Sequence, residues 1–187
     1  MKILICTVGL PGAGKSILVK AARDLGMPVY IMGDIIREAA KAEYGKDDAY
    51  HTGLFMKEIR RKFGRDIVAR LTIDKIKDMR DESRHILIDG LRNIEELEYF
   101  RSTGYKVVLI AVVASFPTRF KRIITRNRRD DIKTLGEFIS RENRERGIGL
   151  VDVIRKADYY FINEGITVEE SIEEAKKLLK LIMEDVN

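Results

Sequence analysis

Short, largely apolar runs alternate along this chain with longer stretches in which apolar residues recur every three or four positions. The apolar runs predict strands at residues 2–8, 28–31, 85–89, 105–114 and 158–162. The longer stretches predict helices at residues 15–25, 34–44, 54–80, 93–102, 117–127, 134–146, 150–157 and 167–184. Two of the runs, 86–88 and 107–113, contain no polar residue, which is typical of parallel strands that are covered on both faces.

Strands that alternate with helices predict βαβ units with right-handed crossovers. We therefore expect an α/β fold, a three-layer sandwich around a five-stranded parallel sheet, formed by a single domain over residues 1–187. Ligands of such sheets bind at the carboxyl ends of the strands. The polar residues that follow each strand are therefore the candidates for chemistry.

The first predicted strand leads directly into a glycine-rich loop with the pattern G-x-x-x-x-G-K-S at residues 9–16. In a phosphate-binding loop (P-loop) of this kind, the backbone N–H groups and the helix dipole point at a phosphate. Lys15 would reach the β- and γ-phosphates, and the Ser16 hydroxyl would bind Mg²⁺. We therefore expect this chain to bind ATP with Mg²⁺. The residues expected to contact the nucleotide in this segment are Gly9, Pro11, Gly12, Ala13, Gly14, Lys15, Ser16 and Ile17.

Two further strand ends carry an aspartate followed by an arginine. Asp34 and Arg37 come after the second predicted strand, and Asp89, Gly90 and Arg92 after the third. Asp34 is placed to cap the following helix, and Asp89 to orient the water shell of Mg²⁺. We expect the two strands to flank the glycine-loop strand, so that both arginines reach one anion beside the γ-phosphate of ATP. These five residues are our candidates for the acceptor site, with Asp89 also a candidate for the metal site.

Composition narrows the class of protein. With 45% hydrophobic and 35% charged residues, a chain of 187 residues buries one substantial core. Cys6 is the single cysteine, which excludes an intrachain disulfide. The apolar start at residues 3–8 is too short to span a membrane and lacks a cleavage site, so we expect no membrane association and a cytoplasmic location. The charge-rich composition is typical of hyperthermophiles.

The net charge of +5 is spread unevenly. One basic cluster lies within residues 57–65, and a second lies within residues 119–129. Such clusters are nucleic-acid footprints, polyphosphate clamps or solvated helix faces. Acidic residues interleave with the first cluster, which favours a solvated face, while RNA stays open as a partner there. We interpret the second cluster as a phosphate clamp, in a lid-like region at residues 119–149.

The strand-end motifs resemble those of nucleoside monophosphate kinases of the adenylate kinase type. Residues 33–37 are similar to that family's G-D-L-L-R, and residues 89–92 to its D-G-F-P-R with one residue missing. Residues 122–126 resemble its R-I-x-x-R at the lid entrance. The resemblance implies that Arg122 flanks the adenine of ATP and that Arg126 touches the transferring phosphates.

A second resemblance covers the end of the chain. Residues 157–165 are similar to the A-D-x-x-I-x-N-x-G of dephospho-CoA kinases, and we place its asparagine, Asn163, with the ATP-binding residues. Over its whole length the chain resembles an archaeal family described as adenylate-kinase-related or dephospho-CoA-kinase-like. Two positions depart from adenylate kinases, because Met32 replaces a threonine near the acceptor base and Glu96 replaces a glutamine that reads it.

Together these resemblances imply a phosphotransferase that moves the γ-phosphate of ATP to a nucleotide-type acceptor such as AMP or another nucleoside monophosphate. Lys15, Arg122, Arg126 and Asp34 are the expected catalytic residues, and the helical region 34–80 is the expected acceptor wall. One alternative is dephospho-CoA kinase, in which Asp34 would act as general base for a ribose hydroxyl. The other is a P-loop ATPase or switch that acts with RNA or a protein partner. Oligomeric state is not readable from the sequence.

Overall fold

The computed structural model describes residues 1–46, 48–79, 82–125 and 133–185 of the chain. Its strands are β1 (Ile3–Val8), β2 (Val29–Ile31), β3 (His85–Asp89), β4 (Lys106–Val113) and β5 (Tyr159–Ile162). Its helices are α1 (Ser16–Asp24), α2 (Met32–Tyr44), α3 (Ala49–Phe63), α4 (Ile67–Asp78), α5 (Ile94–Ser102), α6 (Phe116–Thr125), α7 (Leu135–Gly147), α8 (Leu150–Arg155) and α9 (Val168–Asp185).

The strands of the described residues form one parallel five-stranded sheet in the order β2-β3-β1-β4-β5. The expected α/β class and parallel sheet are thus confirmed. The strand that leads into the glycine loop lies at the centre, with Ile5 opposite Leu87 of β3 and Val108 of β4. The expected placement of β2 was wrong, because β3 lies between β2 and β1 and β2 is an edge strand.

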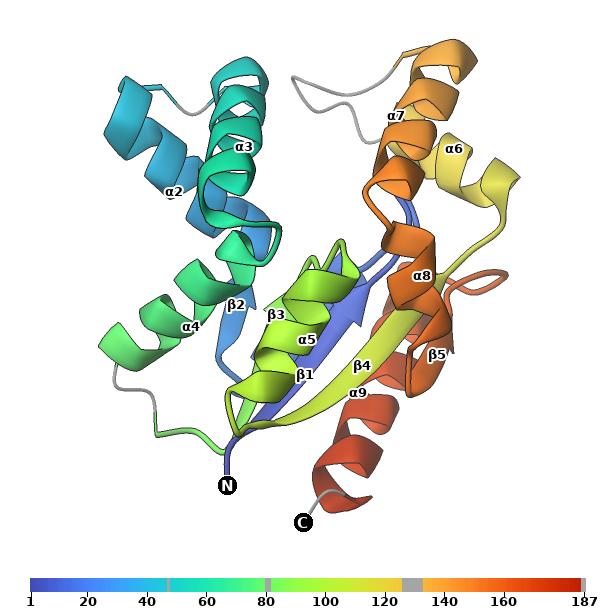
Figure 1. The fold of residues 1–187 in the computed structure, drawn as a ribbon. Coiled ribbons are helices and arrows are strands. Elements are labelled where there is room, and N and C mark those ends of the chain that lie inside the picture. The colour runs from blue at the N-terminus through green and yellow to red at the C-terminus, as the bar shows by residue number, and fades with distance from the viewer. Residues whose placement is uncertain (47, 80–81, 126–132, 186–187) are drawn as a thin grey trace.

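Helices cover both faces of the sheet, which makes the fold a three-layer sandwich (Figure 1). Alternate residues of a strand point to opposite faces. Ile3 and Ile5 pack in the cluster that α1 and α9 cover, whereas Leu4 and Cys6 pack in the cluster beneath α2, α4, α5 and α8. Cys6 is fully buried, and this burial raises the pKa of its thiol. It therefore serves as a small core residue.

The helical region between β2 and β3 differs from the prediction in two ways. The expected single helix 54–80 is two helices, α3 and α4, because the chain turns at Gly64 with a φ of 98° that favours glycine. Helix α2 begins at Met32, before Asp34, and its N-cap residue is Ile31. Asp34 therefore lies inside the first turn and is not the cap that the sequence indicates. None of the described helices is long and apolar enough to cross a membrane.

Candidate phosphate-binding site and its side pocket

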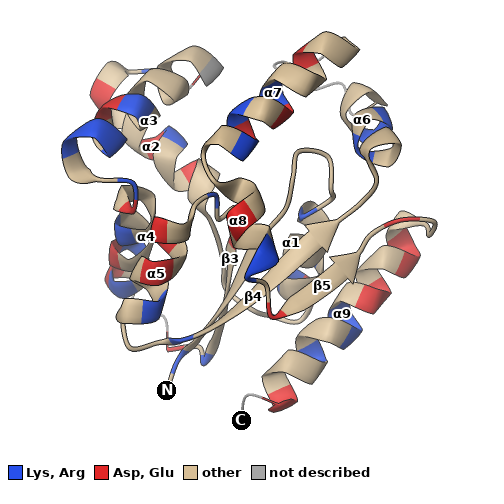
Figure 2. Cartoon of the chain, turned by 45° about the vertical axis from the view of Figure 1, so that its right-hand side comes forward, with Lys and Arg blue, Asp and Glu red and all other residues tan. Residues whose placement is uncertain are grey.

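The glycine loop lies at the carboxyl edge of the sheet, where helices rich in arginine and lysine gather (Figure 2). Residues 9–15 connect the end of β1 to the first turn of α1. The basic helices α3 and α6, and α7 with arginines and glutamates in equal number, rise around this edge on both sides of the loop (Figures 1 and 2). The described residues of the two basic stretches, on α3 and α6, thus lie at one end of the molecule.

Two glycines let neighbouring elements approach the loop closely. Gly12 has a φ of 82°, and a Cβ there would collide with the backbone of Arg119 in α6. Gly14 has a φ of 95°, and a Cβ there would collide with the Asn163 side chain. The loop is therefore held between α6 and the segment that follows β5. At both positions the positive φ disfavours other residues, and a Cβ would have no room.

Lys15 is placed at the centre of the site. Its Nζ donates a hydrogen bond to the Gly9 carbonyl oxygen at 2.9 Å, so that the side chain folds over its own loop. Burial lowers the pKa of Lys15, and the nearby Asp89 carboxylate partly offsets this effect. A partly desolvated ammonium group interacts more strongly with an anion than one in open water. The position suits contact with a phosphate.

Arg122 and Asn163 together support the loop on its other side. Arg122 donates to the Ala13 carbonyl oxygen at 3.2 Å and to the Asn163 carbonyl oxygen at 2.9 Å. The Asn163 amide also donates to Ala13 at 3.0 Å, and its own oxygen accepts from Ser171. Asn163 is 2% exposed, so its side chain is buried against the loop and its hydrogen bonds hold the loop in place.

A cleft of about 650 Å³ opens beside this brace, and we call it the loop cleft. Most of the residues expected to bind ATP line it. They are Gly12, Gly14, Lys15, Ser16, Ile17, Arg122 and Asn163. Three of the acceptor-site candidates, Asp34, Arg37 and Asp89, line the same cleft. Arg122 also lines an open surface depression with Ile166 and Thr167, beyond the end of β5.

Arg119 has a different role from the one that its basic cluster suggests. Its side chain is almost fully buried and forms an ion pair with Glu142 of α7 at 2.7 Å. It also donates to the carbonyl oxygens of Pro11 at 3.2 Å and Ala114 at 3.1 Å. Its guanidinium lies 5.5 Å from the ring centre of Phe138. Arg119 therefore joins α6, α7 and the glycine loop and is not an exposed phosphate clamp.

The strand-end residues meet at a second hollow, which we call the junction cleft. Lys15, Arg37, Asp89, Gly90 and Arg92 line it together. Asp89 accepts a hydrogen bond from the buried Thr7 of β1, which fixes the carboxylate beside the loop. Arg37 is paired with Asp34. The sequence thus identified residues that the fold gathers at one place, even though β2 and β1 are not adjacent.

Helix α7 contributes two residues that sequence reasoning did not select. Arg141 and Glu145 line the junction cleft, and Glu145 forms an ion pair with Arg92 at 3.4 Å. Their spacing of four residues places both on the same side of one helix, which is a signal that could have found them. Glu145 thus contacts Arg92 from outside the sheet, and Arg141 adds a positive charge to the same cleft.

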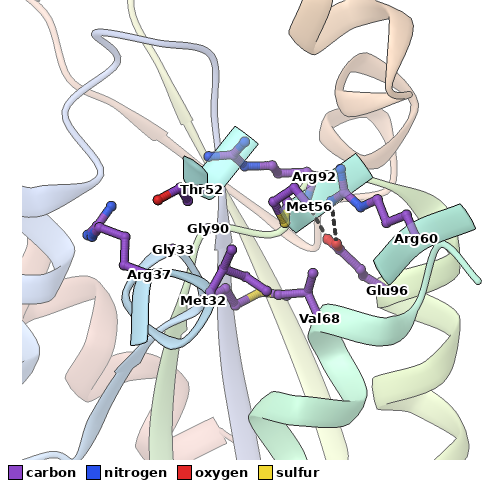
Figure 3. Close-up of a pocket in the computed structure, with 11 residues that line it drawn as sticks. Met32, Gly33, Arg37, Thr52, Met56, Arg60, Val68, Gly90, Arg92 and Glu96 are labelled. Atoms are coloured by element: carbon purple, nitrogen blue, oxygen red, sulfur yellow. Dashed lines mark hydrogen bonds and ion pairs between the residues drawn. The ribbon is translucent and has the colours of Figure 1, made fainter. Parts of the chain in front are cut away.

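A third hollow of about 90 Å³, which we call the side pocket, extends between α2, α3 and the end of β3 (Figure 3). Met32 lies in its apolar wall with Ile36, Met56 and Val68. Its charged residues are Arg37, Arg60, Arg92 and Glu96. Glu96 is 1% exposed and accepts hydrogen bonds from Arg60 at 3.0 Å and from the Arg92 backbone at 2.8 Å. Arg60 was missed because nothing in the sequence links it to Glu96.

The expected site residues also include groups that cannot be placed. Arg126 lies outside the described residues, as do Arg128 and Arg129 at the end of the second basic cluster. Within the described part of the chain, no group of three or more His, Cys, Asp or Glu side chains is arranged to hold a metal ion. Ser16 and Asp89 both line the loop cleft, and hard oxygen donors of this kind fit Mg²⁺ that is also bound by phosphates.

Comparison with known proteins places the chain in a family. A family model described as an AAA domain matches residues 8–139. A UPF0200 protein of Staphylothermus marinus is 43% identical over 185 residues, which is 98% of this chain and 95% of that relative. The chain belongs to the UPF0200 family. The matched segment of this UPF0200 chain begins at the end of β1 and includes the glycine loop, the side pocket and part of α7.

Solved structures confirm the fold. TT1252 from Thermus thermophilus has a TM-score of 0.68 and 20% identity, and the match covers 100% of this chain and 98% of that one. Shikimate kinase from Acinetobacter baumannii, solved in complex with shikimate, has a TM-score of 0.59 and 15% identity, with 99% and 95% covered. This UPF0200 chain therefore has the α/β fold of P-loop kinases.

Proposed function

We propose that this chain is a phosphotransferase that uses ATP and Mg²⁺ and moves the γ-phosphate of ATP to a nucleotide-type acceptor such as AMP or another nucleoside monophosphate. The observation that carries the proposal is the way the three hollows meet. Arg37 lines the loop cleft, the junction cleft and the side pocket, and Lys15 lines the first two. A protein that only hydrolysed ATP would not need a separate pocket that opens beside the γ-phosphate.

The residues divide between the two substrates. The loop, Lys15 and Arg122 would hold ATP, with the acceptor phosphate between Arg37 and Arg92. An acceptor oxygen attacks the γ-phosphorus, a new O–P bond forms, and the bond to the β-phosphate oxygen breaks so that ADP leaves. Bound Mg²⁺ would neutralise phosphate charge, held by Ser16 with Asp89 behind its water shell. The side chains position the reactants and stabilise spread negative charge, which is most of what this reaction requires.

A second candidate acceptor is a hydroxyl group, as in dephospho-CoA. The observation that favours it is that Asp34 lines the loop cleft with Lys15, where a carboxylate could accept a hydroxyl proton. The similarity in fold to a shikimate kinase also supports transfer to a small acceptor. For the RNA alternative, Arg60 of the basic cluster lies in the side pocket and Arg65 is paired with Glu95, whereas Lys57, Arg61 and Lys62 are exposed.

The test is acceptor-dependent formation of ADP with ATP and Mg²⁺, across AMP, GMP, CMP, UMP and dephospho-CoA. Arg37→Ala should weaken acceptor binding roughly tenfold or more while ATP binding changes little, because a charge-assisted bond to phosphate is lost. Arg155→Ala is a matched control, since Arg155 also pairs with an aspartate three residues away and lines none of the three hollows. Equal ADP formation with and without every acceptor would refute the kinase proposal, and unchanged acceptor affinity in Arg37→Ala would refute the site.

A further inference from the structure

The side pocket has an arginine at each of two ends, and the two arginines have different carboxylate partners. In Figure 3, Arg37 lies on one side of the pocket and Arg60, held by Glu96, lies on the other. Arg37 also faces the junction cleft, where the acceptor phosphate is proposed to bind. With the acceptor phosphate at the Arg37 side chain, the end at Arg60 would meet a different part of the acceptor. The apolar wall between the two ends suits a flat or hydrocarbon body.

Glu96 offers little to a ligand because its hydrogen bonds stay inside the protein. One carboxylate oxygen accepts from Arg60, and the other accepts from the backbone N–H of Arg92. Its own backbone N–H donates to the Asn93 side chain. With 1% of the residue exposed, it cannot replace a glutamine that donates and accepts at the edge of a base. Its function in this pocket is to hold the guanidinium of Arg60 in place.

One N–H group of Arg60 has no hydrogen-bond acceptor among the described residues. Its side chain is 17% exposed, and no described residue accepts a hydrogen bond from its buried Nε. A guanidinium has five N–H donors and no acceptor, and a buried donor without a partner is costly. Nε itself is out of reach of a ligand, but the exposed part of the guanidinium lines the pocket and would suit a ligand oxygen, whereas an amino group would bring further N–H donors against it. The chemistry of this end of the pocket is thus complementary to oxygen.

We infer that Arg60 is a specificity-determining residue and that the acceptor carries a carbonyl or carboxylate oxygen at the end that meets Arg60. The inference deepens the proposed function and rests on it for the direction of the acceptor. Among nucleotides it selects keto bases over amino bases, because guanine-like and uracil-like edges present oxygen where adenine and cytosine present an amino group. A small carboxylated alcohol is the other source of the same oxygen chemistry.

The experiment compares ligands that differ at one group. Calorimetry measures binding of IMP against AMP, UMP against CMP, and shikimate as the carboxylate probe. We expect the wild-type protein to bind the keto member of each pair at least tenfold more tightly, or to bind shikimate more tightly than any of the four nucleotides. Arg60→Lys should reduce either preference to less than threefold, because lysine keeps a charge beside Glu96 but lacks the guanidinium donors.

Arg61→Lys is the matched control, since Arg61 is the next residue of α3, is exposed and does not line the pocket. It should keep the full preference, and thermal unfolding of both variants reports whether they fold. If Arg60→Lys does not fold, the wild-type comparison of IMP with AMP decides alone. Equal affinities within both pairs without shikimate binding would overturn the inference, as would a preference that survives in Arg60→Lys.

The experiments can refute the proposed function and the role of Arg60 independently of each other. Acceptor-dependent phosphoryl transfer without any keto or carboxylate preference would leave the proposed function standing and refute the role of Arg60. A clear preference in binding, with no phosphoryl transfer to any acceptor, would refute the proposed function and leave the chemistry of the side pocket standing.

Discussion

Replacement of Arg119 by methionine tests the conclusion that a residue of the basic cluster serves the fold and not a ligand. The substitution removes the guanidinium that is paired with Glu142 and bonded to the Pro11 and Ala114 carbonyls, while a methionine fills much of the same space between Phe116 and Phe138. Removing one partner of a buried ion pair costs about 3–5 kcal/mol because the other charge stays buried.

The loss in the free energy of unfolding caused by Arg119→Met should lie at the lower end of this range of about 3–5 kcal/mol. Glu142 keeps its second partner, Arg146, at 2.8 Å. Although burial raises the pKa of Glu142, the hydrogen bonds from both arginines outweigh it and lower the pKa below its ordinary value, so the carboxylate is charged at neutral pH. We expect a loss of about 3 kcal/mol in the free energy of unfolding, and a fall in Tm of about 6–12 °C for a chain of this length.

The assay is equilibrium unfolding in urea, read as a shift in midpoint at constant slope. Arg146→Met is the matched control, because Arg146 pairs with the same carboxylate but its side chain is 52% exposed, and it should cost about 1 kcal/mol or less. Changing Glu142 to methionine in the Arg119→Met background removes the unpaired charge and should restore at least half of the loss. A loss no larger than that of Arg146→Met, or a larger effect on ATP affinity than on stability, would refute the reasoning.

Two further predictions concern the loop and the pH dependence of stability. Lys15→Ala should keep the thermal stability of the fold, since burial lowers the pKa of Lys15 and its charge adds no stability. The same variant should slow phosphoryl transfer roughly 10²- to 10³-fold in steady-state assays. A variant that unfolds, or that keeps most of the wild-type rate, would contradict this role. Hydrogen bonds from the Ser115 and Thr118 hydroxyls and the Ser115 N–H lower the pKa of Glu164 from 4.5 to about 2, so its stabilisation is complete above about pH 4.5 and is lost as the pH falls towards 2. Glu164→Gln should therefore show a urea midpoint that varies less with pH in this window, and acid profiles identical to wild type would rule out the contribution of Glu164.

The sequence by itself determined the parts of this protein that depend on local pattern. Apolar runs identified the strands of the described sheet, and the signal is clearest for the central strands β1, β3 and β4, because a parallel strand that is buried on both faces has no polar alternation. The loop at residues 9–16 was recognisable because it needs glycines at fixed positions between a strand and a helix. The aspartates and arginines after β2 and β3 could be selected because ligands of such sheets bind at strand ends.

The tertiary structure alone decided which of these residues meet and what each one does. Strand order is set by long-range packing, so the edge position of β2 could not be read from the chain. Arg119 and Arg122 look alike in sequence, yet one is buried against Glu142 and the other lines the loop cleft. Arg60 and Glu96 are paired across 36 residues of sequence. A charge acquires its role from burial and from its partners, and both are created by folding.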